Sequence, residues 1–220
     1  MAQRKFPFTI GEYYHLYNRG NSKQIIFHDK EDYRRFMRLL FLSNKRDKFK
    51  IQFLGKREVF DPINQNSPLV AIGAWTLMPN HFHLLVTPLT ENDISKFMQK
   101  LTTAYSMYYN QKYKRTGGLF EGKFKSEYAE EDRYLKYLFS YIHLNCIKLV
   151  DPRWRTNGTK NISRSVSYLK NYNYSSYIDY SGQKRPEGLI IKSNAFPAYF
   201  TKKNSLEKEL FEWLSYRQDL

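Results

Sequence analysis

The chain has only one cysteine, Cys146, among its 220 residues. A single cysteine excludes an internal disulfide and is typical of proteins kept in a reducing compartment. The chain also lacks a run of about 18 apolar residues, so we expect no membrane-spanning helix. Residues 1–10 contain neither an apolar segment nor the small-residue cleavage site of a secretory signal. These absences predict a soluble cytoplasmic protein that does not act at a membrane.

Acidic residues are scarce relative to basic ones. The 21 Asp and Glu residues are outnumbered by 36 Lys and Arg residues, which gives a net charge of +15. Such an excess favours a polyanionic partner. Aromatic residues make up 17% of the chain, and positive charge mixed with flat rings is typical of surfaces that bind a nucleic-acid backbone while bases stack on side chains. No P-loop is present, so we expect no nucleotide cofactor.

Hydrophobic periodicity predicts strands and one helix in the first part of the chain. Residues 12–18 are typical of a strand. Asp29 is placed to cap a helix that runs to about Ser43. The apolar residues of this helix recur at helical spacing and are Tyr33, Phe36, Met37 and Leu40. The next expected segments are strands in residues 51–54 and 69–77, a polar loop or hairpin tip from Gly55 to Pro68, and a strand that ends at Pro88.

The following part is predicted to contain two longer helices. Asn92 is placed to cap the first, which ends near Tyr113. Its apolar stripe consists of Ile94, Phe97, Leu101, Tyr105 and Tyr108. The second is expected from Glu130 to about Leu149, where Pro152 stops it. Residues 119–129, between them, are typical of a strand that carries Lys123 and Lys125.

The order strand, helix, strand, strand, helix, strand predicts an α+β fold of the ferredoxin-like (RRM-like) type, an antiparallel sheet with packed helices. We assign residues 1–150 to this domain. Residues 151–200 are rich in Asn, Ser and Tyr without clear periodicity, and residues 206–214 predict a short terminal helix. Residues 151–220 are therefore expected to form a C-terminal extension. Because this fold occurs in proteins with many functions, the function has to be inferred from the residues of the site.

Two histidines, His81 and His83, stand one residue apart in a run that continues into Leu84 and Leu85. Alternate side chains of a strand point to the same face, so both imidazoles are expected on one face with Phe82 turned into the core. Imidazole is the commonest metal-binding side chain, so the pair predicts a site for one metal ion. The alternative is that two strand histidines stand together by chance.

The helix expected from Glu130 has two stripes. The apolar stripe consists of Leu135, Leu138, Phe139, Ile142 and Leu149, and is suited to packing on the sheet. The polar stripe consists of Tyr134, Tyr137, Tyr141, Asn145 and Lys148. Tyr141 and Asn145 are four residues apart and therefore neighbours on one surface. A solvated tyrosine-rich face is the alternative to a functional one.

Four segments together resemble the Y1 transposases in their order and spacing. They are residues 14–20 (YHLYNRG), 78–85 (MPNHFHLL), 118–125 (GLFEGKFK) and 141–145 (YIHLN). Over about residues 9–150 the chain is similar to the IS200/IS605-like single-strand DNA transposases, mobile-element enzymes, and to their relatives, the REP-associated tyrosine transposases. Residues 174–177 (YSSY) resemble the tail of the latter branch.

The resemblance implies an HUH endonuclease fold and a metal-dependent tyrosine transposase, a DNA strand transferase active in DNA transposition and recombination. Such an enzyme cleaves and rejoins single-stranded DNA through a 5′-phosphotyrosine intermediate. In this sequence the resemblance implies Tyr141 as the nucleophile. It implies His81, His83 and Asn145 as ligands of a divalent metal ion, and their mixed nitrogen and oxygen donors suit Mg²⁺ or Mn²⁺.

The chain departs from the family pattern in two places. The loop from Gly55 to Pro68 is longer than the usual link between the second and third strands. Cys146 stands where these proteins usually have Pro, which is expected to change the end of the helix but not the chemistry. His15 and His143 are expected to be structural histidines rather than further site residues.

The expected partner is single-stranded or hairpin DNA, bound by a monomer or a homodimer. Basic side chains are expected to position the DNA backbone, while aromatic rings stack on its bases. The residues to which we assign DNA binding are Arg19, Lys112, Lys114, Arg115, Phe120, Lys123, Phe124 and Lys125.

Three other functions stay open from the sequence. A non-catalytic single-stranded nucleic-acid-binding module of RRM-like fold explains the charge and the aromatic residues, but leaves the histidine pair and the Tyr141–Asn145 pair as coincidences. A hydrolase that uses water in place of Tyr141 would need more acidic residues near the histidines to build a two-metal site. A family member can also serve as a host DNA-processing nuclease rather than mobilise itself.

Overall fold

The computed structural model describes residues 7–48, 59–65, 67–200, 209–210 and 212–214. Four strands form one antiparallel sheet in the order β2-β3-β1-β4. The strands are β1 (Tyr14–Arg19), β2 (Val70–Met78), β3 (His81–Pro88) and β4 (Lys125–Tyr128). The longer helices are α1 (Lys30–Leu42), α2 (Asp93–Lys112) and α3 (Asp132–Leu144). The two central strands are the first and the third, which confirms the predicted ferredoxin-like α+β fold.

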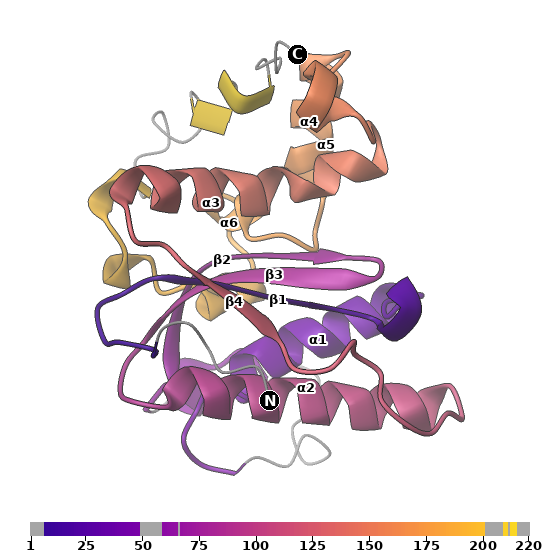
Figure 1. The fold of residues 1–220 in the computed structure, drawn as a ribbon, viewed down its shortest axis with the longest axis vertical. Coiled ribbons are helices and arrows are strands. Elements are labelled where there is room, and N and C mark those ends of the chain that lie inside the picture. The colour runs from indigo at the N-terminus through magenta and orange to yellow at the C-terminus, as the bar shows by residue number, and fades with distance from the viewer. Residues whose placement is uncertain (1–6, 49–58, 66, 201–208, 211, 215–220) are drawn as a thin grey trace.

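Helices α1 and α2 cover one face of the sheet, and α3 lies across the other (Figure 1). The first face buries a core built from the predicted apolar residues of α1 and α2 and from alternate residues of the strands. Trp75 and Phe82 are among its largest fully buried side chains. A second core lies between the sheet and α3, where Leu135, Leu138 and Phe139 pack. Both faces of the sheet are therefore covered.

The predicted starts of α1 and α2 are right in position, although one cap differs from the expected chemistry, and α3 begins at Asp132 instead of the predicted Glu130. Asp29 accepts hydrogen bonds from the N–H groups of Glu31 and Asp32, as an N-cap does. Asn92 occupies the N-cap position of α2 but makes no side-chain capping bond. The residue after it, Asp93, instead accepts a hydrogen bond from the Thr90 N–H at 2.8 Å. The carboxylate thus closes the turn before α2.

The buried carboxylate of Asp32 links α1 to α2. Its oxygens accept hydrogen bonds from Lys112 Nζ (2.7 Å), Tyr113 Oη (2.7 Å), His28 N (2.8 Å) and Tyr108 Oη (2.9 Å). Lys112 also contacts Asp29 at 2.8 Å. Lys112 is one of the residues assigned to DNA binding, and its charge is balanced by these two carboxylates within the protein.

Replacing Asp32 by Asn is expected to lower the free energy of unfolding by about 2 to 3 kcal/mol at neutral pH, because charge-assisted hydrogen bonds are lost. Burial alone raises the pKa of Asp32, but the hydrogen bonds from Lys112 and the other donors outweigh burial and lower it. Because the pKa of Asp32 is lower in the folded than in the unfolded protein, ionised Asp32 stabilises the fold at a pH above its unfolded-state pKa. This contribution is lost as the pH falls through its folded-state pKa. In denaturant titrations at about pH 7 and about pH 3, the gap between wild type and variant should therefore shrink in acid. An equal gap would mean that Asp32 acts through packing alone.

Strands β2 and β3 form a hairpin that turns at Pro79 and Asn80. The described part of the loop from Gly55 to Pro68 lies between α1 and β2, and the prediction that it links two strands depends on residues 51–54. The predicted strand at residues 51–54 lies outside the described residues. Pro79 and Asn80 are themselves turn-forming residues and are sufficient for the tight hairpin.

Two predicted elements are shorter than expected. Strand β4 occupies only Lys125–Tyr128, because the chain before it is irregular and Gly122 has a φ of 86°. Lys123 therefore precedes the strand instead of lying in it. Helix α3 ends at Leu144, and the chain continues as a 3₁₀ segment, η4 (Asn145–Leu149). Leu149, expected on the buried stripe, is exposed because the change to 3₁₀ geometry rotates it away from the core.

The C-terminal extension covers the free edge of β2. Ser176 accepts a hydrogen bond from the Trp75 N–H at 2.9 Å, and the Leu77 N–H donates to Tyr174 at 2.9 Å. An exposed edge strand invites pairing with other chains, and this segment occupies that edge. The extension contains the short helices α4 (Trp154–Asn157), α5 (Ile162–Asn171) and α6 (Tyr177–Tyr180), where the sequence showed no periodicity.

The remaining short segments are 3₁₀ turns. They are η1 (Asn21–Lys23), η3 (Pro62–Gln65), η5 (Pro186–Ile190), η6 (Ser193–Ala195) and η7 (Ala198–Phe200). Residues 209–210 and 212–214 are helical, within the terminal helix predicted for 206–214. None of the helices in the described ranges combines the length and the apolar character needed to cross a membrane.

Candidate active site

The candidate site lies on the sheet face that α3 covers, over the two central strands. Antiparallel pairing sets His83 opposite Tyr17 and His81 opposite Arg19. Cross-strand partners share a face of the sheet, so all four side chains belong to the α3 side. Phe82, between the histidines, is buried in the opposite core, as predicted. The register of β1 and β3 thus brings both histidines under α3.

The two imidazoles of β3 are neighbours held in an apolar setting. The His81 and His83 rings are 5.0 Å apart and almost perpendicular. Burial, reinforced by the positive charges of Lys148 and Arg19, lowers the pKa of His81 to about 4. Burial also lowers the pKa of His83 well below its usual value. Both rings are therefore neutral at neutral pH, the state in which imidazole binds metal ions.

His15 on β1 completes a row of hydrogen-bonding groups behind His83. His15 Nε2 lies 2.8 Å from His83 Nδ1, and His15 Nδ1 lies 3.5 Å from a carboxylate oxygen of Glu127 on β4. Glu127 also accepts a hydrogen bond from Tyr17 Oη at 2.9 Å. Contact with His15, followed by that of Tyr17, lowers the pKa of Glu127 to about 2 against the opposing effect of burial. Glu127 is thus a fixed anion at the end of the row Glu127–His15–His83.

The sequence did not assign His15 or Glu127 to the site, and His15 was expected to be structural. Strand alternation places Tyr17, a neighbour of His83, on the same face as His15, and this is the signal that marks His15 as a candidate. The expectation for His143 agrees with its surroundings. Its ring is fully buried, and His143 Nε2 lies 2.8 Å from Ser176 Oγ in the C-terminal extension.

Tyr141 reaches the histidines from α3. Its ring is edge-on to the His83 ring at 5.5 Å and to the His15 ring at 5.9 Å. Burial raises the pKa of Tyr141, while the Arg155 guanidinium and then the Asn145 side chain act in the opposite direction. Asn145, one turn further along, is fully buried. The structure therefore brings together Tyr141 and the two histidines, with Asn145 beside Tyr141.

Several polar atoms at this site are buried without a partner. Among the described residues, none donates to or accepts from His83 Nε2 or Asn145 Oδ1. Most buried polar atoms in proteins are hydrogen-bonded, because an unsatisfied group costs about 1 to 3 kcal/mol. Two unsatisfied acceptors in one site mark it as a place where a ligand or an ion supplies the missing interactions.

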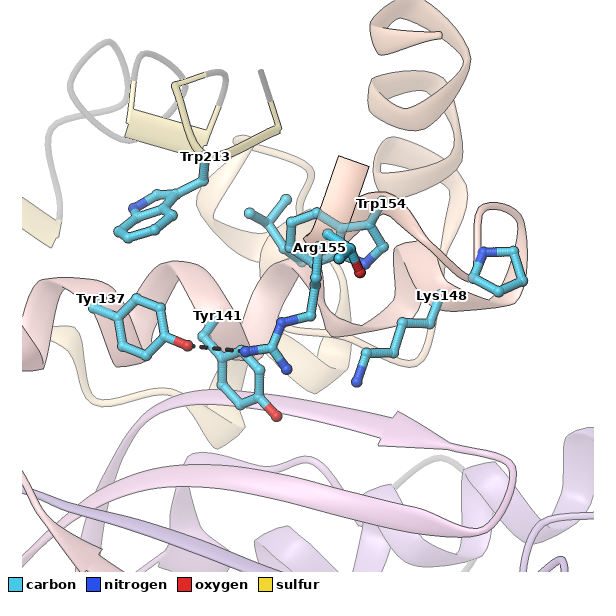
Figure 2. A pocket seen from close by; sticks show the side chains of 9 residues that line it. Tyr137, Tyr141, Lys148, Trp154, Arg155 and Trp213 are labelled. Carbon is cyan, nitrogen blue, oxygen red and sulfur yellow. Dashed lines mark hydrogen bonds between the residues drawn. The ribbon is translucent and has the colours of Figure 1, made fainter. Parts of the chain in front are cut away.

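The other tyrosines of the polar stripe have different surroundings. Tyr134 Oη donates a hydrogen bond to Glu127 at 3.1 Å, and its pKa is raised to about 12 by burial and by that carboxylate. Tyr137 Oη accepts a hydrogen bond from Arg155 at 3.1 Å (Figure 2). The three rings stack in sequence along α3, with centroid distances of 5.9 and 5.8 Å. Of these three tyrosines of α3, Tyr141 is the one whose ring contacts both His83 and His15 in the described structure, as Tyr17 does from β1.

The residues predicted to bind DNA divide into two groups. Arg19 lies beside His81 and forms an ion pair with Glu121, and Lys125 stands opposite Tyr17 on β4. These two border the site. The other basic residues lie at the end of α2 and in the loop after it. In that loop Arg115 donates a hydrogen bond to the Gln24 side chain at 2.8 Å. Those further residues are Lys112, Lys114, Arg115 and Lys123.

The two aromatic residues of this prediction are partly buried in the core of the α1–α2 face. Phe120 contacts the rings of Phe82 and Tyr105, at 5.9 and 6.4 Å. Phe124 stacks on Phe8 at 6.4 Å. Their partial exposure leaves room for contact with a base, although much of each ring packs within the protein.

Comparisons with known proteins agree with this architecture. The family model described as "Transposase IS200 like" matches residues 12–145, more than half of the chain. A solved structure of a REP-associated tyrosine transposase bound to a REP hairpin is similar over 85% of this chain and 90% of that one, with 14% identity and a TM-score of 0.49. No curated protein matched. The matched segment contains the whole sheet, both strand histidines, Tyr141 and Asn145, and the chain belongs to the family of IS200-like (Y1) transposases.

Proposed function

We propose that the chain cleaves and rejoins single-stranded DNA with Tyr141 as the nucleophile, which becomes linked to a 5′-phosphate. The observation that carries this proposal is the edge-on contact of the Tyr141 ring with the His83 and His15 rings, at 5.5 and 5.9 Å. A phenol held beside imidazoles in a partly buried site has the surroundings that nucleophilic catalysis requires. Membership of the IS200-like transposase family supports the same reaction.

The residues of the site fit one divalent metal ion. We propose His81, His83 and Asn145 as its ligands, because His83 Nε2 and Asn145 Oδ1 are buried without partners in the described part of the chain. His81 Nδ1 lies 2.6 Å from Asn80 Oδ1 and donates to it, which leaves the other ring nitrogen as a lone-pair donor. Two imidazoles and an amide oxygen suit Mg²⁺ or Mn²⁺ near phosphates. When bound, such an ion neutralises and polarises the phosphate.

A site of two metal ions bridged by carboxylates has no support. Among the described residues, no three His, Cys, Asp or Glu side chains gather to hold an ion. Glu127 is the acidic residue beside the histidines, and it is engaged with His15, Tyr17 and Tyr134. This donor set argues against the alternative in which a two-metal centre activates water in place of Tyr141.

The chemistry of the chain's own residues is a transesterification. Tyr141 Oη forms a bond to phosphorus as the bond from phosphorus to the 3′ oxygen breaks. The phenolic proton is released, and the 3′ oxygen takes up a proton to become a hydroxyl. The ester is conserved in the phosphotyrosine link, so attack by another 3′-hydroxyl rejoins the strand without a nucleotide cofactor. Burial raises the pKa of Tyr141 and so disfavours the phenolate. The positive charge of Arg155 acts in the opposite direction and favours the ionised form.

Glu127 and His15 are positioning residues in this proposal. If His83 Nε2 is to offer a lone pair, the His83 proton must sit on Nδ1 and be donated to His15 Nε2, 2.8 Å away. His15 then carries its own proton on Nδ1, which faces Glu127 at 3.5 Å. The anion at the end of the row therefore favours the tautomer of His83 that metal binding requires.

The non-catalytic RRM-like alternative conflicts with the covered sheet. RRM modules stack bases on aromatic side chains of an exposed sheet face. Here α1 and α2 cover one face, and α3 covers the other (Figure 1). DNA that reaches the histidines has to enter beside α3 rather than spread over the sheet.

The test of the proposed function is a covalent adduct. The protein is incubated with Mg²⁺ or Mn²⁺ and with single-stranded hairpins from its own genomic flanks that are labelled at the 3′ end, and the mixture is then resolved on a denaturing gel. We expect a labelled species that survives denaturation and carries the segment 3′ of the break. A binding module or a water-dependent hydrolase forms no such species, so its absence with hairpins that the protein binds would contradict the proposal.

Binding of hairpin DNA is expected to weaken steeply with salt. If about four phosphates are contacted, the affinity should fall about 50-fold between about 50 and 200 mM salt, because released counterions drive association. Fluorescence anisotropy with a hairpin carrying a single-stranded tail measures this dependence. A fully paired duplex of the same length is the control and should bind more weakly. Affinity that does not change with salt, or that is equal for the duplex, would rule out the single-strand preference.

A further inference from the structure

A cavity of about 410 Å³ opens beside Tyr141, between α3 and the beginning of the C-terminal extension. Figure 2 shows side chains from α3, η4, α4 and the helical residues near the C-terminus around it. Its volume lies in the range of about 300 to 1,000 Å³ that is typical of small-ligand sites. The lining residues used below are Tyr137, Tyr141, Lys148, Trp154, Arg155 and Trp213. Those after Asn145 lie beyond the segment that the family model matches.

Two cations converge on this cavity. The Arg155 guanidinium lies over the Tyr141 ring, 4.7 Å from its centroid, and donates a hydrogen bond to Tyr137 Oη. Figure 2 shows the Lys148 amine pointing toward the same space beside the Tyr141 hydroxyl. Within the described ranges, neither cation has a carboxylate at ion-pair distance. Two adjacent positive charges without a counterion favour the binding of an anion.

Lys148 is half-buried, so keeping its amine charged next to Arg155 is unfavourable in the protein without a bound anion. Burial, and then repulsion by Arg155, lowers the pKa of the Lys148 amine. Lys148 and Arg155 line the same cavity beside Tyr141. An anion bound there would relieve the repulsion between the two cations.

Aromatic side chains also line the cavity. Trp154 is one of them, and most of its indole is buried. Tyr137 and Trp213 also line the cavity, and their rings pack edge-on with centroids 5.1 Å apart. Cationic side chains next to aromatic rings match a phosphate that carries a sugar and a base.

We infer that this cavity binds one phosphodiester group of the DNA strand together with its nucleotide, and that Arg155 clamps the phosphate attacked by Tyr141. The inference rests on the proposed function, because the ligand is the strand that Tyr141 cleaves. Guanidinium binds phosphate through two parallel hydrogen bonds, so Arg155 can orient the group as well as balance its charge. Lys148 supplies a second positive charge from the side of η4. This assigns a specific role to a residue of the C-terminal extension.

The first test compares Arg155→Gln with Arg153→Gln. Arg153 is exposed two residues away and does not line the cavity, so its replacement removes the same charge without touching the site. In the presence of Mn²⁺, single-turnover cleavage of a labelled hairpin is expected to fall about 100-fold in Arg155→Gln and to stay near wild type in Arg153→Gln. Arg155→Lys keeps the charge but loses the paired geometry, and it should be intermediate. Equal cleavage by Arg155→Gln and wild type would overturn the inference.

The second test asks whether Arg155 senses one phosphate charge. Binding is measured in EDTA, where cleavage is suppressed, with hairpins that carry a neutral methylphosphonate at each single-stranded position in turn. Arg155→Gln should bind the unmodified strand about tenfold more weakly than wild type. With the methylphosphonate at one position, the position cleaved by wild type, the two proteins should bind alike. A tenfold gap that persists at every position would contradict a specific clamp.

The outcomes separate this inference from the proposed function. If wild type forms the covalent adduct and Arg155→Gln forms it equally fast, only the phosphate clamp is wrong. If wild type forms no adduct, the proposed function is wrong and the clamp falls with it. Lys148→Gln is the second variant. It removes the other cation but keeps the contact between Arg155 and the Tyr141 ring. Thermal melting of each variant confirms that a loss of cleavage does not come from unfolding.

Discussion

The covalent adduct is expected to disappear when Tyr141 is replaced by Phe. The substitution removes one oxygen and keeps the ring that packs against His83 and His15. Folding and hairpin affinity should therefore stay close to wild type, while cleavage falls by at least about 10⁴-fold, as expected when an enzyme loses its nucleophile. A denaturing gel measures the adduct, and mass spectrometry of the trapped wild-type species should place the nucleotide on the peptide that contains Tyr141.

Tyr137→Phe and Tyr134→Phe are the matched controls, because both rings lie on the same stripe of α3 as Tyr141. Tyr137 Oη accepts a hydrogen bond from Arg155, and Tyr134 Oη donates one to Glu127. Neither ring contacts His83 in the way that Tyr141 does, so both variants should still form the adduct. An adduct mapped to Tyr137 or Tyr134, or one that persists in Tyr141→Phe, would show that the nucleophile is another residue.

Local spacing was enough to predict which residues share a surface. Strand alternation put His81 and His83 on one face and Phe82 in the opposite core, where the structure has them. Helical spacing put Tyr141 beside Asn145. What spacing does not contain is the contact between the strand and the helix, because Tyr141 and His83 are far apart in the chain. That contact depends on how α3 packs over the sheet, and only the family resemblance pointed to it.

The features that were not predicted have specific physical causes. The β2–β3 hairpin was not predicted as such, because a short apolar run is compatible with more than one role. The turn at Pro79 and Asn80 was the better hairpin signal. The contact of His15 with His83 depends on the register between β1 and β3, which a single strand does not reveal. Its 2.8 Å contact with His83 follows from that pairing.

Arg155 shows a harder limit of sequence reasoning. It lies in a four-residue helix inside a segment without periodicity, where nothing in the neighbouring residues indicates a functional role. Its position depends on Trp154, which is buried in the cluster that includes the apolar residues of α3 and so anchors the start of the extension. The anchoring of one large aromatic residue therefore decides which way the next side chain points, and this is visible only in three dimensions (Figure 2).

The second large effect is expected for His81→Ala, which should abolish metal-dependent cleavage. His81 is the more exposed of the two strand histidines, and its one hydrogen bond is to the adjacent Asn80 side chain. Its loss should therefore cost little stability, unlike loss of the buried His83. If His81 is a ligand, the affinity for Mn²⁺ should fall by about 100-fold or more, since even residues that only orient a ligand contribute about 10- to 100-fold. Isothermal titration with Mn²⁺ measures this without reference to cleavage.

His28→Ala is the control for this experiment. His28 precedes α1, away from the α3 face, and its ring nitrogen contacts Tyr109 Oη at 2.7 Å. Removing it deletes one imidazole from the chain but leaves the strand histidines untouched, so Mn²⁺ affinity and adduct formation should stay at wild-type levels. Undiminished cleavage by His81→Ala in Mg²⁺ or Mn²⁺ would falsify the ligand role. Lost cleavage with unchanged Mn²⁺ affinity would instead mean that His81 contacts the DNA, because the ion would then be held without it.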